Sequence, residues 1–467
     1  PVPPSSVQAV QGAKLLFNLS ASPESVCKHD YLKSLIAEQS SRTMAAYIYA
    51  SAGHGESSSD LVFAGNAIIA ELGTVLGVSD RFVRNDRMVV RDIDVEYIST
   101  RRTARNTFYY PDAQEMRVVE VDVDEILNDG DIRRRIEPLY FVPKDEAARA
   151  VHCREVFAIQ SAGLAQRLEH TGCKTAVLGI SGGLDSTLAL LAVCDTYDLL
   201  GLDRRGIIGV TMPGFGTTDR TYQNALAMVR ELGCTLREIP IREACEQHFK
   251  DIGLDAADRT IAYENSQARE RTQILMDVAN MCGGMVIGTG DMSELALGWA
   301  TYNGDHMSMY SVNGSVPKTL VRHIVAWYAE VQKSTTTREI LKDIIDTPIS
   351  PELIPAHESG EIKQKTEDLV GPYELHDFFL YYVLRCGFRP SKIYMLARHA
   401  FSCSQYDDTT IKKWLSVFCR RFFNQQFKRS CLPDGPKVGT CGLSPRGDWQ
   451  MPSDASSASW LKECESL

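Results

Sequence analysis

The sequence lacks any apolar run long enough to cross a membrane and lacks an excess of basic residues. No uninterrupted apolar stretch reaches the roughly 18 residues of a spanning helix, and the first residues show neither a basic start nor the apolar core of a signal peptide. Lys and Arg number 50 against 60 Asp and Glu, which gives a formal net charge of −10. Because non-specific nucleic-acid binding needs a basic face, we expect a cytoplasmic protein that binds neither membranes nor nucleic acids.

Paired cysteines are also missing. The 13 cysteines include no C-x-x-C pair, and their number is odd. A disulfide framework or a zinc site would show paired, regularly spaced cysteines, so this pattern predicts reduced thiols. Hydrophobic residues make up 44% and charged residues 24% of the 467 residues, which excludes a disordered, collagenous or coiled-coil protein and predicts more than one globular domain.

The first part of the chain is predicted to be rich in strands. Residues 28–45 have the pattern of a helix, and the charged, proline-containing residues 126–147 are typical of a linker. Short apolar or alternating runs bounded by Gly and Ser predict strands over 14–19, 46–50, 61–63, 67–70 and 88–95.

From residue 148 the pattern changes to helices and strands in turn. Such alternation predicts βαβ units in an α/β fold with a doubly wound parallel sheet, whose ligands bind beyond the carboxyl ends of the strands. The expected helices cover 148–169, 186–200, 219–232 and 266–282, and the expected strands cover 174–180, 207–212, 235–240 and 284–288.

A glycine-rich loop lies between the first of these strands and the next helix. Residues 181–186 read Ser-Gly-Gly-Leu-Asp-Ser and follow Gly179 and Ile180. Glycines let the backbone approach a ligand closely, and the free N–H groups of a helix start favour an anion. No lysine follows Gly183, so the loop does not have the Walker A pattern. The sequence therefore predicts a phosphate-binding loop of another kind.

Two other interpretations of this loop stay open at this point. Residues 179–183 also match G-x-S-x-G, the nucleophile elbow of α/β-hydrolases, which would need a downstream acid and a histidine such as His306 or His399. The loop could also be a tight turn in which Asp185 and Ser186 cap the helix.

A second polar segment follows the strand predicted over 284–288. Residues 288–294 read Gly-Thr-Gly-Asp-Met-Ser-Glu, and Asp291 with Glu294 resembles a capping box. The alternative is that Glu294 and Asp185 share a Mg²⁺ ion with the phosphates of ATP, since Mg²⁺ typically takes one or two carboxylates. Upstream, Asn265 and Arg269 are four residues apart and would lie on one helix face, although Arg269 could equally be a surface charge.

Together these segments resemble a known family. The loop at 181–186 resembles that of the N-type ATP pyrophosphatases. The segment 288–294, the pair Pro317-Lys318 and the tail at 427–433 (Phe-Lys-Arg-Ser-Cys-Leu-Pro) are similar to NAD synthetase in its glutamine-dependent form. In that form a nitrilase-like glutaminase domain precedes the synthetase domain, and residues 15–23 resemble a segment of it.

The resemblance implies an architecture. Residues 1–125 would be the C-terminal half of a nitrilase-like αββα sandwich, with apolar faces left uncovered, and 126–147 the linker. Residues 148–467 would be the synthetase domain, with an adenine nucleotide α-hydrolase-like sheet. A homo-oligomer is expected by the same resemblance.

The resemblance also implies a reaction. NAD synthetases adenylate the nicotinate carboxylate of deamido-NAD with ATP and release pyrophosphate, and ammonia then displaces AMP. An acid of this kind is a poor electrophile until AMP activates it, so the enzyme works mainly by positioning and charge neutralisation. The adenine is expected near residues 211–214.

Site residues follow by family match. The expected ATP contacts are Gly179, Ser181, Gly182, Gly183, Asp185, Ser186, Thr289, Lys318 and Ser350. The expected deamido-NAD contacts are Asn265, Arg269, Glu294, Trp299, Tyr302 and Lys428. Asp185 and Glu294 are the expected Mg²⁺ ligands, and Ser22 and Lys28 match glutamine-contacting positions.

One departure concerns the glutaminase part. The family's Glu-Lys-Cys triad would lie upstream of Pro1, and Cys27 follows the matching segment, so it is not expected to be the nucleophile. We therefore expect this polypeptide alone to use free ammonia. Two other functions remain as alternatives: another amide ligase of the ATP pyrophosphatase group, such as a GMP or asparagine synthetase relative, or a nucleotide-binding protein without turnover.

Overall fold

The computed structural model describes residues 2–85, 88–105, 108, 116–122, 132–255, 257–258, 260–347 and 370–467. The chain divides into two units, Pro1–Ile136 with Cys386–Phe388, and Glu137–Arg385 with Arg389–Leu467. In the part of the chain described, no helix combines the length and the apolar character that crossing a membrane would require.

The first unit contains a four-stranded mixed sheet. Its strands are β1 (Leu15–Ser20), β2 (Ala46–Ser51), β3 (Ala67–Glu71) and β4 (Thr74–Val78), in that spatial order, and only the pair β1–β2 is parallel. The helices of this unit are α1 (Pro4–Val10), α2 (Lys28–Arg42) and α3 (Val95–Thr103).

Helix α2 packs on one face of this sheet. Ile36 of α2 shares a small core with Tyr49 of β2 and Ile68 of β3. On β1, in contrast, Phe17 and Leu19 are 71% and 87% exposed. The expected uncovered apolar side chains are therefore present in this unit.

Two strand predictions in this unit are wrong. Residues 61–63 form neither a helix nor a strand. The backbone hydrogen bond described for them runs from the Glu24 N–H to the Val62 carbonyl, and no strand among the described residues pairs with them. Residues 88–95 do not form a strand either, because Asp94 caps a helix instead: its Oδ1 accepts a hydrogen bond from the Tyr97 N–H at 2.8 Å.

Strand β4 was not foreseen. Leu72 and Gly73, with φ of 49° and 94°, form the two-residue turn that joins β3 to β4. A turn of this length needs positive φ at its two central residues, which is why Asn-Gly and Asp-Gly are its usual sequences. Leucine rarely adopts positive φ, so in Leu72-Gly73 only the glycine indicates the turn.

The second unit is built on a parallel sheet with the strand order β7-β6-β5-β8-β9. The prediction of a doubly wound parallel sheet is confirmed. The strands are β5 (Ala176–Gly179), β6 (Ile207–Thr211), β7 (Thr235–Glu238), β8 (Met285–Gly288) and β9 (Tyr310–Ser311).

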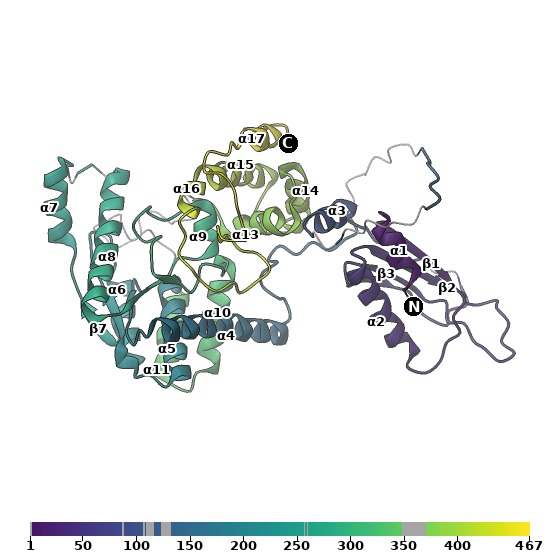
Figure 1. Cartoon of the computed structure of the whole chain (residues 1–467), viewed down its shortest axis with the longest axis horizontal. Helices are drawn as coiled ribbons and strands as arrows, with labels where there is room; N and C mark the ends of the chain where they lie inside the picture. The colour runs from purple at the N-terminus through teal and green to yellow at the C-terminus, as the bar shows by residue number, and fades with distance from the viewer. Residues whose placement is uncertain are drawn as a thin grey trace. The chain divides into compact units, whose positions relative to one another are not determined.

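Helices cover both faces of this sheet, because its residues share one core with α4, α5, α10 and α11 and another with α7 and α8. Figure 1 labels these helices in the second unit. The helices that pack around it are α4 (Glu146–Thr171), α5 (Leu184–Leu200), α6 (Asp219–Glu231), α7 (Arg242–Ile252), α8 (Ile261–Cys282), α10 (Lys318–Val331) and α11 (Thr335–Ile345). The shorter helices and the C-terminal group are α9 (Met292–Leu297), α13 (Tyr373–Tyr381), α14 (Pro390–Ala400), α15 (Asp408–Asn424), α16 (Gln426–Arg429) and α17 (Ala458–Glu465).

Successive residues of β5 point into two different cores. Leu178 lies in the core formed with α4, α5, α10 and α11, whereas Val177 lies in the core formed with α7 and α8. Burial on both faces explains why the central strands are apolar throughout and do not alternate. All four helices and four strands predicted from residue 148 onward are present, and only their ends differ; α8, for example, begins at Ile261.

The order of the strands determines where in the second unit a ligand site is expected. After β5 the chain adds β6 on one side, and β8 later pairs with the other side. The loops after β5 and β8 therefore leave the same edge of the sheet, where a change in strand order opens a crevice. The two polar segments found in the sequence are these two loops.

A buried histidine of α13 makes the fold sensitive to acid. His376 is 1% exposed; its Nε2 lies 2.7 Å from the Val370 carbonyl and its Nδ1 has no hydrogen-bond partner among the described residues. The ring is therefore neutral with its proton on Nε2. Burial lowers the pKa of His376 from 6.5 to about 4.

We expect this histidine to weaken the fold in acid. Because the folded-state pKa lies below the unfolded one, its contribution is complete above pH 6.5 and is lost as the pH falls toward 4. At 1.36 kcal/mol per pKa unit the loss is at most about 3 kcal/mol. His376→Phe should flatten the urea-unfolding free energy over this range, whereas His170→Gln, at an exposed position, should not. An unchanged pH profile in His376→Phe would contradict the assignment.

Candidate active site at the ends of β5 and β8

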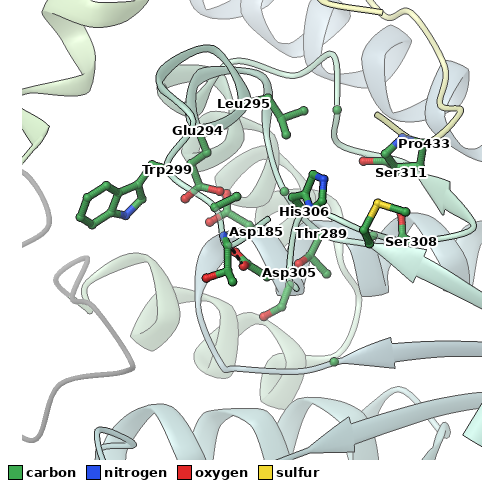
Figure 2. A pocket seen from close by; sticks show the side chains of 18 of the residues that line it. Asp185, Thr289, Glu294, Leu295, Trp299, Asp305, His306, Ser308, Ser311 and Pro433 are labelled. Carbon is green, nitrogen blue, oxygen red and sulfur yellow. Dashed lines mark hydrogen bonds between the residues drawn. The ribbon is translucent and has the colours of Figure 1, made fainter. Parts of the chain in front are cut away.

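A cavity of about 590 Å³ lies at the carboxyl ends of the central strands in the second unit. Figure 2 shows Asp185, Thr289 and Glu294 gathered in it, with Trp299 on one side and His306 on the other in this view. The predicted site residues that line the cavity are Gly179, Ser181, Gly183, Asp185, Ser186, Asn265, Thr289, Glu294, Trp299, Lys318 and Lys428.

The loop after β5 has the geometry of an anion-binding turn. Gly182 has φ of 84°, and a Cβ built on it would lie 2.0 Å from the Thr221 carbonyl oxygen of α6. The Ser181 hydroxyl lies 3.1 Å from the Ser186 hydroxyl and accepts the Gly183 N–H at 3.2 Å. No side-chain cap is described for the start of α5. Its first N–H groups are therefore available to an anion at the cavity.

These contacts argue against the interpretation of residues 179–183 as the nucleophile elbow of a hydrolase. The polar contacts described for the Ser181 hydroxyl go to Ser186 and Gly183 and not to a histidine. His306 lines the cavity, but its Nδ1 accepts the Asn303 N–H at 2.9 Å. The nucleophile–base pair that a hydrolase needs is therefore not formed among the described residues.

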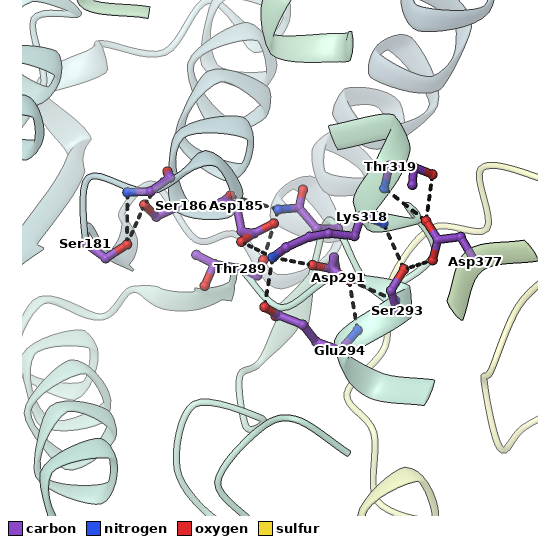
Figure 3. A network of polar contacts seen from close by, with 12 residues as sticks. Ser181, Asp185, Ser186, Thr289, Asp291, Ser293, Glu294, Lys318, Thr319 and Asp377 are labelled. Atoms are coloured by element: carbon purple, nitrogen blue, oxygen red, sulfur yellow. Dashed lines mark hydrogen bonds and ion pairs between the residues drawn. The ribbon is translucent and has the colours of Figure 1, made fainter. Parts of the chain in front are cut away.

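Opposite the loop, one lysine holds three carboxylates (Figure 3). Lys318 Nζ lies 2.6 Å from Asp185 Oδ2, 2.9 Å from Asp291 Oδ2 and 2.8 Å from Glu294 Oε1. The carboxylates come from α5 and from the start of α9, and the lysine from the start of α10. The sequence predicted Asp185 and Glu294 here, but it suggested only a helix cap for Asp291.

Asp291 has both functions. Its Oδ1 accepts the N–H groups of Ser293 and Glu294 at 2.8 and 3.0 Å, which caps α9, while Oδ2 faces Lys318. The helix cap and the carboxylate cluster thus use different oxygens of one side chain. The reciprocal bond of a capping box, from the Asp291 N–H to Glu294, is not among the hydrogen bonds described, because the Glu294 carboxylate pairs with Lys318.

Burial dominates the electrostatics of this cluster. It raises the pKa of Asp291 well above its usual value, with a further contribution from Glu294, and it raises the pKa of Glu294 to about 7. Burial alone would lower the pKa of Lys318, but the three carboxylates together raise it well above its usual value. The lysine is therefore charged, whereas burial favours the protonated forms of Asp291 and Glu294.

This donor set fits a divalent metal ion. Asp185, Asp291 and Glu294 each offer a ligand oxygen, and these oxygens lie within 4.8 Å of one another. Asp185 Oδ1 is buried without a hydrogen-bond partner among the described residues. Oxygen ligands from carboxylates are the kind that Mg²⁺ prefers.

Neighbouring side chains fix the cluster in place. Asn313 Nδ2 donates to the carbonyls of Asp185 and Thr289 at 2.9 and 3.0 Å, which ties the two loops together. Asp377 of α13 accepts the hydroxyl of Ser293 and, at 2.6 Å, that of Thr319. Neither Asn313 nor Asp377 carried a signal in the sequence, because their partners are far away in the chain.

Residues expected to bind the dinucleotide gather around the loop that follows α9. Lys428 Nζ donates to the carbonyls of Gly298 and Ala300 at 2.8 and 2.7 Å, and the Thr301 hydroxyl donates to Asn265 Oδ1 at 2.9 Å. Arg269 and Tyr302 do not line the cavity itself. They meet each other beside it, where Arg269 Nε donates to the Tyr302 carbonyl at 3.3 Å.

Two further cations in this region were missed. Arg429 is 1% exposed, and its guanidinium donates to the carbonyls of Ala296 at 2.7 Å and Leu295 at 3.3 Å. Arg421 Nε donates to the Leu297 carbonyl at 3.0 Å. Burial lowers the pKa of Arg429 to about 9. Both arginines satisfy the carbonyls at the end of α9, which is the usual task of cations at a helix C-terminus.

Three predicted residues lie elsewhere. Ser350 is outside the described residues. Ser22 and Lys28, matched to glutamine binding, belong to the first unit, where the Lys28 ammonium donates to the Pro23 carbonyl.

The strand order, the phosphate-type loop and the carboxylate cluster together define an adenine nucleotide α-hydrolase-like protein. The family model for NAD synthase matches residues 156–394. A solved glutamine-dependent NAD(+) synthetase from Cytophaga hutchinsonii is similar in fold, with a TM-score of 0.56 at 18% identity, over 98% of this chain and 71% of that one. The predicted fold class is confirmed.

Comparison with curated relatives identifies the family more specifically. The chain is 42% identical to the glutamine-dependent NAD(+) synthetase of Mycobacterium leprae and 40% identical to that of Mycobacterium tuberculosis; both alignments cover 100% of this chain and 72% of the relative. The chain belongs to the glutamine-dependent NAD(+) synthetase family, as its motifs predicted.

We expect Gly182→Ala to disrupt the phosphate loop. The new Cβ would meet the Thr221 carbonyl at 2.0 Å in a backbone conformation with φ of 84°, and strain of this kind costs roughly 1–3 kcal/mol before any clash. Urea unfolding should show a loss of at least that size. Gly290→Ala is the control, because no atom lies within 4 Å of its built Cβ. Equal stability of the two variants would show that the loop relaxes freely.

Proposed function

We propose that the cavity of the second unit catalyses the ATP-dependent amidation of deamido-NAD to NAD, with AMP and pyrophosphate as the other products and with ammonia derived from glutamine. The observation that carries this proposal is the meeting of a phosphate-type loop, a carboxylate cluster and four of the six predicted dinucleotide residues in one cavity of about 590 Å³. A family of ligases with this name contains the chain.

ATP is assigned to the β5 side of the cavity. The hydroxyls of Ser181 and Ser186 and the free N–H groups at the start of α5 would hold the departing pyrophosphate. Thr211 and Met212 at the end of β6 line the same cavity, which supports an adenine position near residues 211–214. Lys318 lines the same cavity and pairs with Asp185 of the loop at 2.6 Å, so its charge would also act on a bound phosphate.

Asp185, Glu294 and Asp291 would together hold Mg²⁺. The bound ion would supply positive charge that offsets the phosphates. The chain's own contribution is to keep these carboxylates together: Asn313 fixes the backbone at Asp185, and the Asp291 cap fixes the start of α9. Charge neutralisation of this preorganised kind accounts for much of the rate enhancement in phosphoryl and adenylyl transfer.

The dinucleotide is assigned to the side of the cavity next to α9. Asn265, Trp299 and Lys428 line this side, and Lys428 holds the loop at 298–300 by its carbonyls. Arg269 and Tyr302 contact each other, and the Tyr302 ring stacks on His306, which lines the cavity. In this arrangement the nicotinate carboxylate would face the α-phosphate, and no side chain need act as a nucleophile.

Other assignments also belong to the proposal. Ser22 and Lys28 would contact glutamine in the first unit, and Ser350 would contact ATP. The family resemblance further implies a homo-oligomer in the cytoplasm.

Pyrophosphate release tests the proposed reaction. We expect release only when ATP and deamido-NAD are both present, with AMP and no ADP, whereas xanthosine monophosphate or aspartate as the acceptor should give none. Release with ATP alone, or formation of ADP, would refute the reaction.

Asp185→Asn should lower the rate of this release about 100-fold, because one charge contact in a catalytic site is worth a few kcal/mol. Asp195→Asn, on the same helix but outside the cavity lining, is the matched control. A change within twofold at saturating Mg²⁺ would remove Asp185 from the metal site.

Lys428→Met tests the position of the dinucleotide. Loss of the two bonds to Gly298 and Ala300 should release the loop and raise the apparent KM for deamido-NAD about tenfold, with little effect on the KM for ATP. Lys462→Met, on the exposed face of α17, should change neither constant. A larger effect on ATP would move Lys428 out of the dinucleotide site.

A further inference from the structure

Two cysteines far apart in sequence meet in the second unit, away from the phosphate loop. Cys194 lies on α5, and Cys234 lies between α6 and β7, 40 residues later. Their sulfur atoms are 3.6 Å apart. A disulfide bond requires about 2.05 Å between the sulfurs, so the two thiols must approach by only about 1.5 Å, within reach of small side-chain rotations.

The two thiols differ in access to solvent. Cys194 is fully buried, whereas Cys234 is only partly buried. Arg204 lies close by, with its Nη1 donating to the Leu232 carbonyl at 3.2 Å. The hydrogen bond from Cys194, opposed by burial and aided by the Arg204 charge, lowers the pKa of Cys234. A partly exposed thiol with a lowered pKa, beside a buried thiol, is the arrangement of an attacking and a resolving cysteine.

A second thiol pair shows that proximity alone is not enough. Cys419 of α15 and Cys464 of α17 are also hydrogen-bonded, but both are at most 1% exposed. Neither of these thiols is open to an oxidant. Cys27 and Cys403, by contrast, are exposed thiols in other parts of the chain.

We propose that Cys194 and Cys234 are a modification site at which a peroxide forms an intramolecular disulfide bond. The Cys234 thiolate attacks one peroxide oxygen, the O–O bond breaks, and the leaving hydroxide takes up a proton to become water. Cys194 then attacks the Cys234 sulfur, the S–O bond breaks, and the Cys194 proton leaves with the hydroxide as a second water. Two thiols are oxidised and one peroxide is reduced, so the step balances.

The bond would join α5 to the short segment between α6 and β7. Helix α5 begins directly after this loop, and the Thr221 carbonyl of α6 abuts Gly182 within it. A cross-link between residues 40 apart also restricts the unfolded chain, which stabilises the folded state. This inference concerns thiol chemistry and stands independently of the reaction assigned to the cavity.

Peptide mass spectrometry tests the proposal. The full chain is titrated with hydrogen peroxide, denatured in N-ethylmaleimide and digested without a reductant. We expect a linked Cys194–Cys234 peptide, two mass units lighter than the two free peptides together, at peroxide levels that leave Cys27 and Cys403 mostly alkylated. Cys419 and Cys464 should remain reduced. Oxidation of Cys27 and Cys403 while Cys194 and Cys234 are still alkylated would overturn the proposal.

The order of attack has its own test. In Cys194→Ser, dimedone should label Cys234 as a sulfenic acid, and Cys234→Ser should give no label at Cys194; the reverse would overturn the assigned roles. Oxidised wild-type chain should melt several degrees higher than the reduced chain, and Cys403→Ser, as the control, should keep this difference. A lower melting temperature after quantitative linkage would contradict the stabilising effect.

Discussion

The site depends on one buried ammonium group. Without Lys318, the carboxylates of Asp185, Asp291 and Glu294 would repel one another in a region where burial already raises the pKa of two of them. Because the three acids come from two loops on opposite sides of the crevice, the ion pairs also set the distance between those loops. The ion pairs of Lys318, together with the sheet, therefore fix the position of the phosphate loop relative to the start of α9.

The C-terminal helices complete the site from the other side. Arg421, Lys428 and Arg429 all donate to carbonyls of residues 295–300, at the end of α9 and in the loop after it. The hydrogen bonds described for Arg429 go to neutral acceptors, which explains why burial lowers its pKa. Glu294 and Trp299, at the two ends of this segment, therefore owe their positions to a tail more than 120 residues away.

The secondary-structure predictions failed where a single local contact decided the outcome. Residues 88–95 have an apolar and partly alternating pattern, yet the Asp94 carboxylate satisfies a free N–H and starts a helix. Residues 61–63 are apolar but pair with no strand in the part of the chain that the structure describes. In the second unit the predictions held, because both faces of its sheet are buried and the apolar pattern is correspondingly strong.

By itself the sequence determined the doubly wound sheet, its phosphate loop and the family, because these depend on local periodicity and on short motifs whose residues are neighbours in the chain. Only the tertiary structure decided that Asp291 joins the carboxylate cluster, that Asn313 ties the two loops, and that Cys194 meets Cys234. Each of these contacts joins segments brought together by strand order and helix packing, and no local pattern encodes such a meeting.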